Sequence, residues 1–121
     1  MDKYITHLED LPTYSPAGHS QTTNRRLLGP GPFGSSRFEV VHGRIEYGGQ
    51  ADPHAHRDLE QAFFLLEGKA EVEIEGEREV VGPHDFIYLP PGTPHRVTPL
   101  EGSSLKILII YSPPLSSSGK D

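Results

Sequence analysis

Glycine and proline interrupt this chain so often that no stretch shows apolar residues at helical spacing over the length of an ordinary helix. The 121 residues include 13 Gly and 12 Pro, well above the roughly 12% share that these two residues have in an average protein. They stand between short apolar runs, so turn signals recur about every 8–12 residues. This spacing predicts an all-β sandwich or barrel and argues against a disordered chain.

Alternation of apolar and polar side chains predicts where the strands lie. The clearest case is 69–75, where Ala70, Val72 and Ile74 alternate with charged residues. Gly48-Gly49 is predicted to be a turn. A strand pair or one long strand is expected over 37–47, interrupted near Gly43. Further strands are expected over 61–66, 78–81, 85–89, 95–98 and 105–111.

The length suits one domain with a single core. Residues 1–36 lack a sustained apolar pattern, so they are predicted to form an extended N-terminal arm with at most a short strand at 26–28. Residues 37–111 are predicted to form a β-barrel. Residues 112–121, which are rich in serine, proline and glycine, are predicted to form a flexible C-terminal tail.

Two of the predicted strands are apolar on both faces, namely 63–66 and 107–110. A strand of a small antiparallel barrel turns only one face to the core, so its other face needs a cover. The cover is expected from a second subunit, from the N-terminal arm, or from both. We therefore predict a homodimer.

Charge and composition exclude several classes of protein. The net charge of −6 argues against nucleic acid or an anionic membrane surface as the main partner. The chain has no cysteine, which excludes disulfides, zinc fingers, iron–sulfur clusters and thiol nucleophiles. No apolar run approaches the roughly 18–20 residues of a membrane span, and residues 1–10 hold no stretch typical of a signal peptide. The expected location is the cytoplasm.

Some side chains are expected to be structural. If Ile45 faces the core, His42 and Arg44 share the opposite face of their strand, which is either solvated or a cavity wall, with the solvated face favoured. Large aromatic side chains are expected in the core, namely Tyr47, Phe63, Phe86 and Tyr88.

His54-Ala55-His56 is a candidate metal-binding pair. In a strand, residues two apart point to the same side, so two imidazoles in this pattern can chelate a metal ion. A solvated pair with no ligand role is the alternative. A third histidine, His95, follows the turn sequence Pro90-Pro91-Gly92 by three residues.

These two segments together resemble both motifs of the cupin family, and the resemblance covers roughly residues 38–111. The first motif corresponds to Gly48, His54-Ala55-His56, Gln61 (where glutamate is usual) and Gly68, and the second to His84 (in place of glycine), Pro90-Pro91-Gly92, His95 and Pro99 (in place of asparagine). The resemblance implies a small single-domain cupin, which is a double-stranded β-helix or jelly-roll barrel. It also implies one divalent transition metal (Fe, Mn, Ni, Zn, Co or Cu) held by His54, His56, Gln61 and His95.

Two of these positions leave a choice open. The fourth ligand is Gln61 or Glu60, and strand alternation favours Gln61 because it shares a face with Phe63 and Leu65. His84 is interpreted as a turn residue in preference to a ligand, since histidine is among the residues enriched at positive φ.

The resemblance implies a small-molecule substrate but not its identity. The first hypothesis is a metal-dependent enzyme that uses Lewis-acid chemistry for isomerisation, ring opening or elimination, since neutral imidazole and amide ligands leave the metal its full charge. Its catalytic residues are not assigned, with Glu60, a tyrosine and a bound hydroxide as candidate bases. The alternatives are an Fe(II)- or Cu-dependent dioxygenase and a non-catalytic ligand-binding cupin.

Overall fold

The computed structural model describes residues 3–16, 18–51 and 58–115. These residues form strands joined by turns, and no α-helix occurs among them. The elements in chain order are η1 (Leu8–Asp10), β1 (Thr13–Tyr14), β2 (His19–Leu28), η2 (Pro32–Gly34), β3 (Glu39–Ala51), β4 (Glu60–Glu67), β5 (Ala70–Ile74), β6 (Glu77–Val81), β7 (Phe86–Leu89), β8 (His95–Pro99) and β9 (Leu105–Ser112), where η marks a single 3₁₀ turn.

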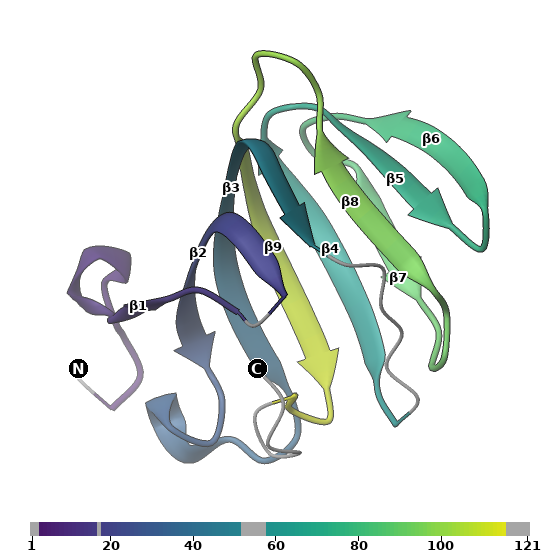
Figure 1. The fold of residues 1–121 in the computed structure, drawn as a ribbon. Coiled ribbons are helices and arrows are strands. Elements are labelled where there is room, and N and C mark those ends of the chain that lie inside the picture. Colours follow the sequence, from purple (N-terminus) through teal and green to yellow (C-terminus); the bar gives the residue numbers. More distant parts are fainter. Residues whose placement is uncertain (1–2, 17, 52–57, 116–121) are drawn as a thin grey trace.

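The strands form two antiparallel sheets that face one another (Figure 1). Sheet A has the order β1-β2-β3-β9-β4-β7, and sheet B has the order β6-β5-β8. Neighbours in sheet A such as β3 and β9 are far apart in sequence, as in a jelly roll. The predicted all-β barrel is therefore confirmed.

The core lies between the inner faces of the two sheets. Along β4 and β9 every second side chain is buried, which is the period that a pleated strand imposes. Sheet A contributes Phe63, Leu65 and Ile107, and sheet B contributes Ala70 and Val72. Alternation thus decides which side chains of each strand can reach the interior.

The strands expected over 61–66, 69–75, 78–81, 85–89, 95–98 and 105–111 are β4 to β9, each within one residue at either end. The predicted turn at Gly48-Gly49 is wrong, because β3 continues through it to Ala51. Gly48 has a φ of +88°, and the pairing of β2 with β3 shifts register between Ser20 and Thr22, so the glycines mark a bulge. No break occurs at Gly43, which stays paired with Ile107.

The predicted boundaries of the arm and the tail need correction. Residues 19–28 of the expected arm form the long strand β2, which pairs with β3 inside sheet A. At the other end, Ser112 still belongs to β9, Pro114 is buried, and Leu115 packs against the core. Residues 112–115 are therefore not a flexible tail, and 116–121 lie outside the described residues.

The expectation of a core position is wrong for three of the four aromatic residues. Phe63 is buried, but Tyr47, Phe86 and Tyr88 are 52%, 61% and 51% exposed. Along β7 the inward positions belong to Ile87 and Leu89, which turns Phe86 and Tyr88 to the outside.

His42 and Arg44 lie on the outer side of sheet A, because Val41 and Ile45 of the same strand are buried. The solvated-face interpretation of these residues is confirmed. The described residues also contain no helix long and apolar enough to span a membrane, and a location in the cytoplasm stays a prediction.

We expect His42 to make the protein less stable in mild acid. Partial burial lowers the pKa of His42 from its usual 6.5, and the positive charges of Lys106 and Arg25 lower it further, against smaller opposing effects of a backbone hydrogen bond and of Glu67. Because the pKa is lower in the folded state, the unfolded state binds more protons near this pH. The contribution of His42 to stability is thus present above about pH 6.5 and is lost as the pH falls through the lowered value.

Histidine ring NMR and urea unfolding on both sides of this pH would check the expectation. Lys106→Gln should raise the pKa of His42 and weaken the acid loss that this residue causes. A His42 that titrates at or above the ordinary value in the folded protein would contradict it.

Candidate metal centre

Gln61 is directed into the barrel from the start of β4. Its side chain is 3% exposed and shares the inner face with Phe63 and Leu65. Among the described residues, the buried Oε1 atom of Gln61 has no hydrogen-bond partner. A buried carbonyl oxygen left in this state costs about 1–3 kcal/mol, so an interior cation or donor that binds this oxygen would offset that cost.

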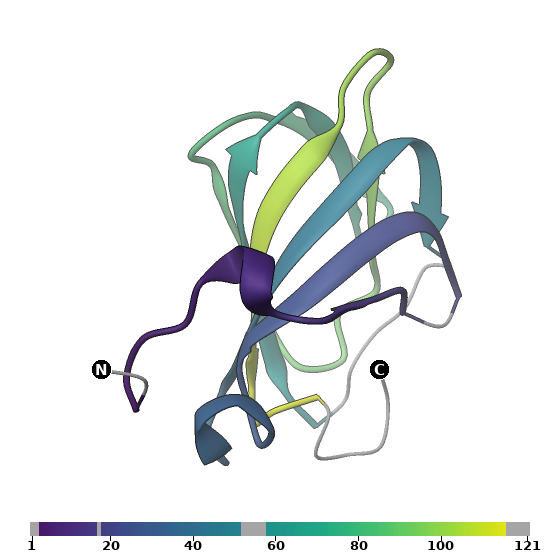
Figure 2. The ribbon, with the colours of Figure 1, turned by 90° about the vertical axis from the view of Figure 1, so that its left-hand side faces the viewer.

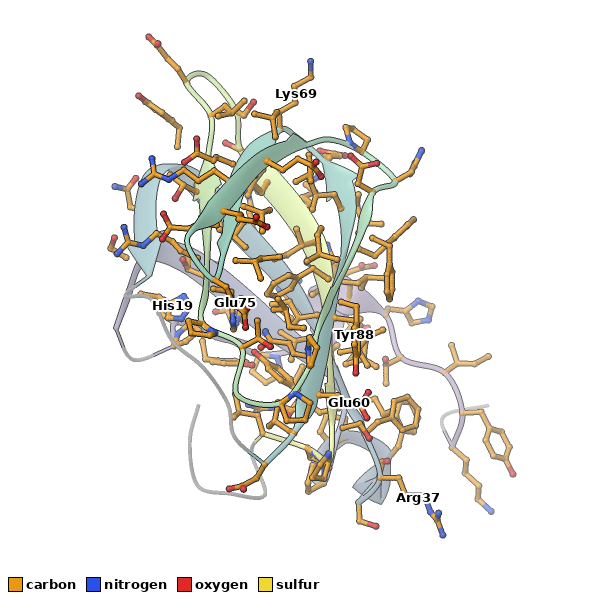
Figure 3. The ribbon with its side chains drawn as sticks, turned by 90° about the vertical axis from the view of Figure 1, so that its right-hand side faces the viewer. His19, Arg37, Glu60, Lys69, Glu75 and Tyr88 are labelled. Carbon is orange, nitrogen blue, oxygen red and sulfur yellow. The ribbon has the colours of Figure 1, made fainter. Side chains whose placement is uncertain are left out.

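Glu60 points the opposite way. Its carboxylate accepts a hydrogen bond of 2.9 Å from the hydroxyl of Tyr88 on the outer side of sheet A (Figure 3). This hydrogen bond raises the pKa of Tyr88 above its usual 10, with smaller contributions from burial and from the charge of Glu60. Of the two alternatives for the fourth ligand, only Gln61 therefore faces the interior. Its role as a ligand stays a prediction.

His95 is the first residue of β8 and is 4% exposed. Its Nδ1 atom lies 3.0 Å from the carbonyl oxygen of Thr93. Because a carbonyl can only accept, Nδ1 carries the hydrogen and donates it, which leaves the lone pair of the neutral ring on Nε2. This is the tautomer that a metal ligand needs, and a second hydrogen bond of this kind commonly orients such rings. Phe63 packs edge-on against the imidazole, with 5.9 Å between ring centroids.

The turn 90–94 brings His95 to the same end of the barrel as Gln61. Gln61 pairs with Leu89, the last residue of β7 in sheet A. The chain then turns, with the Thr93 amide donating to the Pro90 carbonyl at 3.2 Å, and enters sheet B at His95. The two candidate ligands therefore come from different sheets and flank one turn.

A polar row crosses the inner face of sheet A beside Gln61. Tyr111 on β9 lies directly opposite Gln61 on one side and Glu39 of β3 on the other. Glu39 is 1% exposed and its carboxylate accepts a hydrogen bond from Arg26 Nε. The guanidinium of Arg26 also lies 4.6 Å from the centroid of the Tyr14 ring. The end of the barrel that holds Gln61 therefore contains a partly buried ion pair and a phenol.

Glu39 and Tyr111 were not among the residues predicted to face the interior. The sequence does indicate the orientation of Glu39. It lies six residues before the inward Ile45, and side chains an even number of residues apart on one strand point to the same face. That Glu39 and Tyr111 are neighbours could not be predicted from a local pattern, because the pairing of β3 with β9 joins segments that are far apart in the chain.

His54 and His56 lie outside the described residues. Within the ranges 3–16, 18–51 and 58–115, no three His, Cys, Asp or Glu side chains gather as a metal site. The structure thus places Gln61 and His95 from the predicted set. Their amide oxygen and imidazole nitrogen fit a divalent transition metal, for which both donor types are suitable.

His84 is a turn residue, as predicted. Its φ is +73°, its side chain is exposed, and its ring stacks on Phe64 at 6.0 Å on the outer side of sheet A. It does not face the interior where Gln61 and His95 lie.

Two antiparallel sheets with candidate ligands from both at one end define a small jelly-roll protein with a candidate interior site. The family model described as "Cupin domain" matches residues 41–111, and the chain belongs to the cupin family. The resemblance predicted from the two motifs is thereby confirmed.

Three similar proteins give this membership its context. The uncharacterized protein MJ1618 of Methanocaldococcus jannaschii is 30% identical over 92 residues, covering 76% of this chain and 74% of that protein. Quercetin 2,3-dioxygenase of Bacillus subtilis is 36% identical over 61 residues, covering 48% of this chain and 17% of that enzyme. The structure of the polyketide cyclase RemF from Streptomyces resistomycificus superposes with a TM-score of 0.79 at 28% identity, covering 89% of this chain and 78% of that one. Relatives of the chain thus include enzymes.

Proposed function

We propose that this chain is a metal-dependent enzyme that acts on a small, oxygen-rich organic molecule by Lewis-acid chemistry, namely isomerisation, ring opening or elimination. The observation that carries the proposal is the buried Oε1 of Gln61, which has no hydrogen-bond partner among the described residues and lies at the barrel end that His95 enters. Similarity to a polyketide cyclase supports an enzymatic role in general.

His54, His56, Gln61 and His95 would hold one divalent transition metal (Fe, Mn, Ni, Zn, Co or Cu). When bound, such an ion supplies positive charge that polarises a carbonyl or hydroxyl oxygen of the substrate. All four side chains are neutral as ligands, so they do not diminish that charge.

Neighbouring residues of the chain prepare this site. The Thr93 carbonyl orients the His95 ring, and the ring of Phe63 packs against it and excludes water from that side. Glu60 is unsuited as the general base because it faces outward. Tyr111 is the tyrosine that shares the inner row with Gln61, and it brings a phenol to the site.

The test is turnover of a panel of hydroxy- and keto-acids by fully metal-loaded protein under argon. We expect at least one member to be converted without oxygen by the wild type and by Glu60→Ala, and not by Gln61→Ala. Failure of every member with full metal loading would count against the proposal. Binding of a member without any chemical change would favour a non-catalytic ligand-binding cupin.

A second candidate is a dioxygenase, which the similarity to quercetin 2,3-dioxygenase supports. This candidate predicts oxygen consumption that depends on both the substrate and Fe(II) or Cu. The same panel in air, followed with an oxygen electrode, separates the two candidates, because only the second requires oxygen for turnover.

A further inference from the structure

The inner face of β2 differs from the inner faces of its neighbours in sheet A. Three successive inward side chains of β2 are polar, namely Thr22, Asn24 and Arg26. The inward positions beside them on β3 and β9 are apolar or glycine, namely Val41, Gly43, Ile45, Leu105, Ile107 and Ile109. A polar side chain in such an interior costs free energy unless it finds a partner. The partners of the three side chains therefore separate a structural role from a role in binding.

Two of the three polar side chains have partners within the described residues. The Thr22 hydroxyl donates to the Ser20 carbonyl at 3.1 Å. The Nε atom of Arg26 donates to the carboxylate of Glu39, and its guanidinium lies over the ring of Tyr14. These contacts hold Thr22 and Arg26 in place without any ligand.

The carboxamide oxygen of Asn24 has no such partner. Asn24 is 5% exposed, and its buried Oδ1 atom makes no hydrogen bond to any described residue. A Cβ added to Gly43 would lie 3.0 Å from this oxygen and 3.3 Å from side-chain carbons of Ile107 and Ile109. The oxygen thus lies against a glycine backbone beside two isoleucines, whose side chains have no hydrogen to donate. An acceptor in this position is complementary to a donor that comes from outside the chain.

Asn24 and the candidate metal ligands border one interior. β2 and β3 run side by side and bend together (Figure 2). β3 also lies against β8, the strand that begins at His95. Asn24 therefore belongs to the wall that β2 and β3 form, and Gln61 lies across sheet A on β4. β2 is three strands from β4, about 14 Å at the usual strand spacing, so a molecule that reaches both residues spans a large part of the barrel.

We propose that Asn24 is a specificity-determining residue, whose Oδ1 atom accepts a hydrogen bond from a substrate hydroxyl remote from the metal-binding end of the substrate. The inference rests on the proposed function, which places that other end at Gln61 and His95. It narrows the substrate class to molecules that carry such a hydroxyl, because a keto or carboxylate oxygen can only accept. A buried acceptor rejects an analogue without the donor, since the acceptor is then left unpaired.

The test measures by isothermal titration calorimetry how much a hydroxyl strengthens binding. The probes are straight-chain acids of four, six and eight carbon atoms with a terminal hydroxyl, each paired with the acid that lacks it. Their aliphatic stems suit the isoleucines beside Asn24. We expect the zinc-loaded wild type to bind the hydroxylated member of at least one pair about 5- to 150-fold more tightly, as for one hydrogen bond to a buried acceptor. The chain length of that pair measures the span to Asn24.

Asn24→Leu removes the acceptor and keeps about the same side-chain volume. It should abolish the preference for the hydroxyl and leave the urea midpoint no lower than that of the wild type, because the oxygen has no partner to lose. Asn24→Ala, which needs no extra room, should also abolish the preference even if Asn24→Leu fails to fold. Thr22→Val is the matched control, because Thr22 is equally buried but bonded to Ser20. It should lower the urea midpoint and keep the preference.

Equal binding within every pair by the wild type, or no binding of any probe, would overturn the proposal. A preference that survives both Asn24 substitutions would do the same, and so would an Asn24→Leu variant that is less stable in a protein without any preference, since Asn24 would then bond only an internal water. Turnover of the acid panel with no preference would overturn this inference alone. A preference that depends on Asn24 in a protein that converts no acid would count against the proposed function alone.

Discussion

His95→Ala should abolish tight metal binding. The wild type is expected to hold about one divalent transition metal per chain, and the variant loses the proposed ligand whose ring is already oriented by the Thr93 carbonyl. Removing a group that hydrogen-bonds to a metal ligand typically lowers metal affinity 10- to 100-fold. Removing the ligand itself should therefore lower metal affinity more than about 100-fold. Elemental analysis of untagged protein, followed by metal titration of the apoprotein, measures the effect.

The neighbours Gln61 and Glu60 supply the matched comparison. Gln61→Ala should weaken metal binding strongly, because it removes the buried Oε1. Glu60→Ala should leave the metal in place, because the Glu60 carboxylate bonds to Tyr88 on the outer side of the sheet. Equal metal loss in both variants, or none in either, would show that Gln61 is not a ligand. A wild type that binds no metal even after reconstitution would refute the four-ligand site.

Gly68→Ala should destabilise the protein by about 2–5 kcal/mol. Gly68 has a φ of +90°, a conformation that costs an L residue about 1–2 kcal/mol. An added Cβ would also lie 2.4 Å from the Ser104 carbonyl oxygen and 2.9 Å from a methyl group of Leu105. Overpacking of this kind costs typically 1–3 kcal/mol. The loss is a large part of the 5–15 kcal/mol by which proteins are ordinarily stable.

Gly76→Ala separates the two causes. Gly76 has a φ of +85°, but a Cβ there would meet no atom within 4 Å. It should therefore cost only the conformational term, about 1–2 kcal/mol. Denaturant unfolding of both variants gives the comparison, and equal losses would mean that the contact with Ser104 is relieved at no cost. Gly68 closes the first cupin-like motif, and the close approach of Ser104 explains why a glycine stands there.

Strands β4 to β9 could be predicted because their own residues carry the necessary information. Their alternation and the turns between them show which side chains face inward, and this includes Gln61 but not Glu60. β2 could not be predicted in the same way, because its buried positions hold Thr22 and Asn24 in place of aliphatic residues. Its place in the sheet follows from pairing with β3, which no local pattern shows.

The site was predictable only in part for the same reason. The turn sequence before His95 is a local feature, and so is the alternation that gives Gln61 the same face as Phe63. The structure places both His95 and Gln61 at one end of the barrel. The row that joins Glu39, Tyr111 and Gln61 depends on register between β3, β9 and β4, which is set by packing of the whole sheet. Likewise, Gly48 and Gly49 have the composition of a turn, but pairing with β2 makes them a bulge.

The position of Gln61 on one sheet and His95 on the other has a mechanical consequence. An ion held by both would fasten the two layers together at that end of the barrel, where otherwise the turn 90–94 connects β7 to β8. Metal binding would then restrain sheet A and sheet B from moving apart at that end. Backbone amides at the start of β4 and β8 would exchange their hydrogens more slowly in the loaded protein, while those of β6 at the far edge of sheet B would keep their rate.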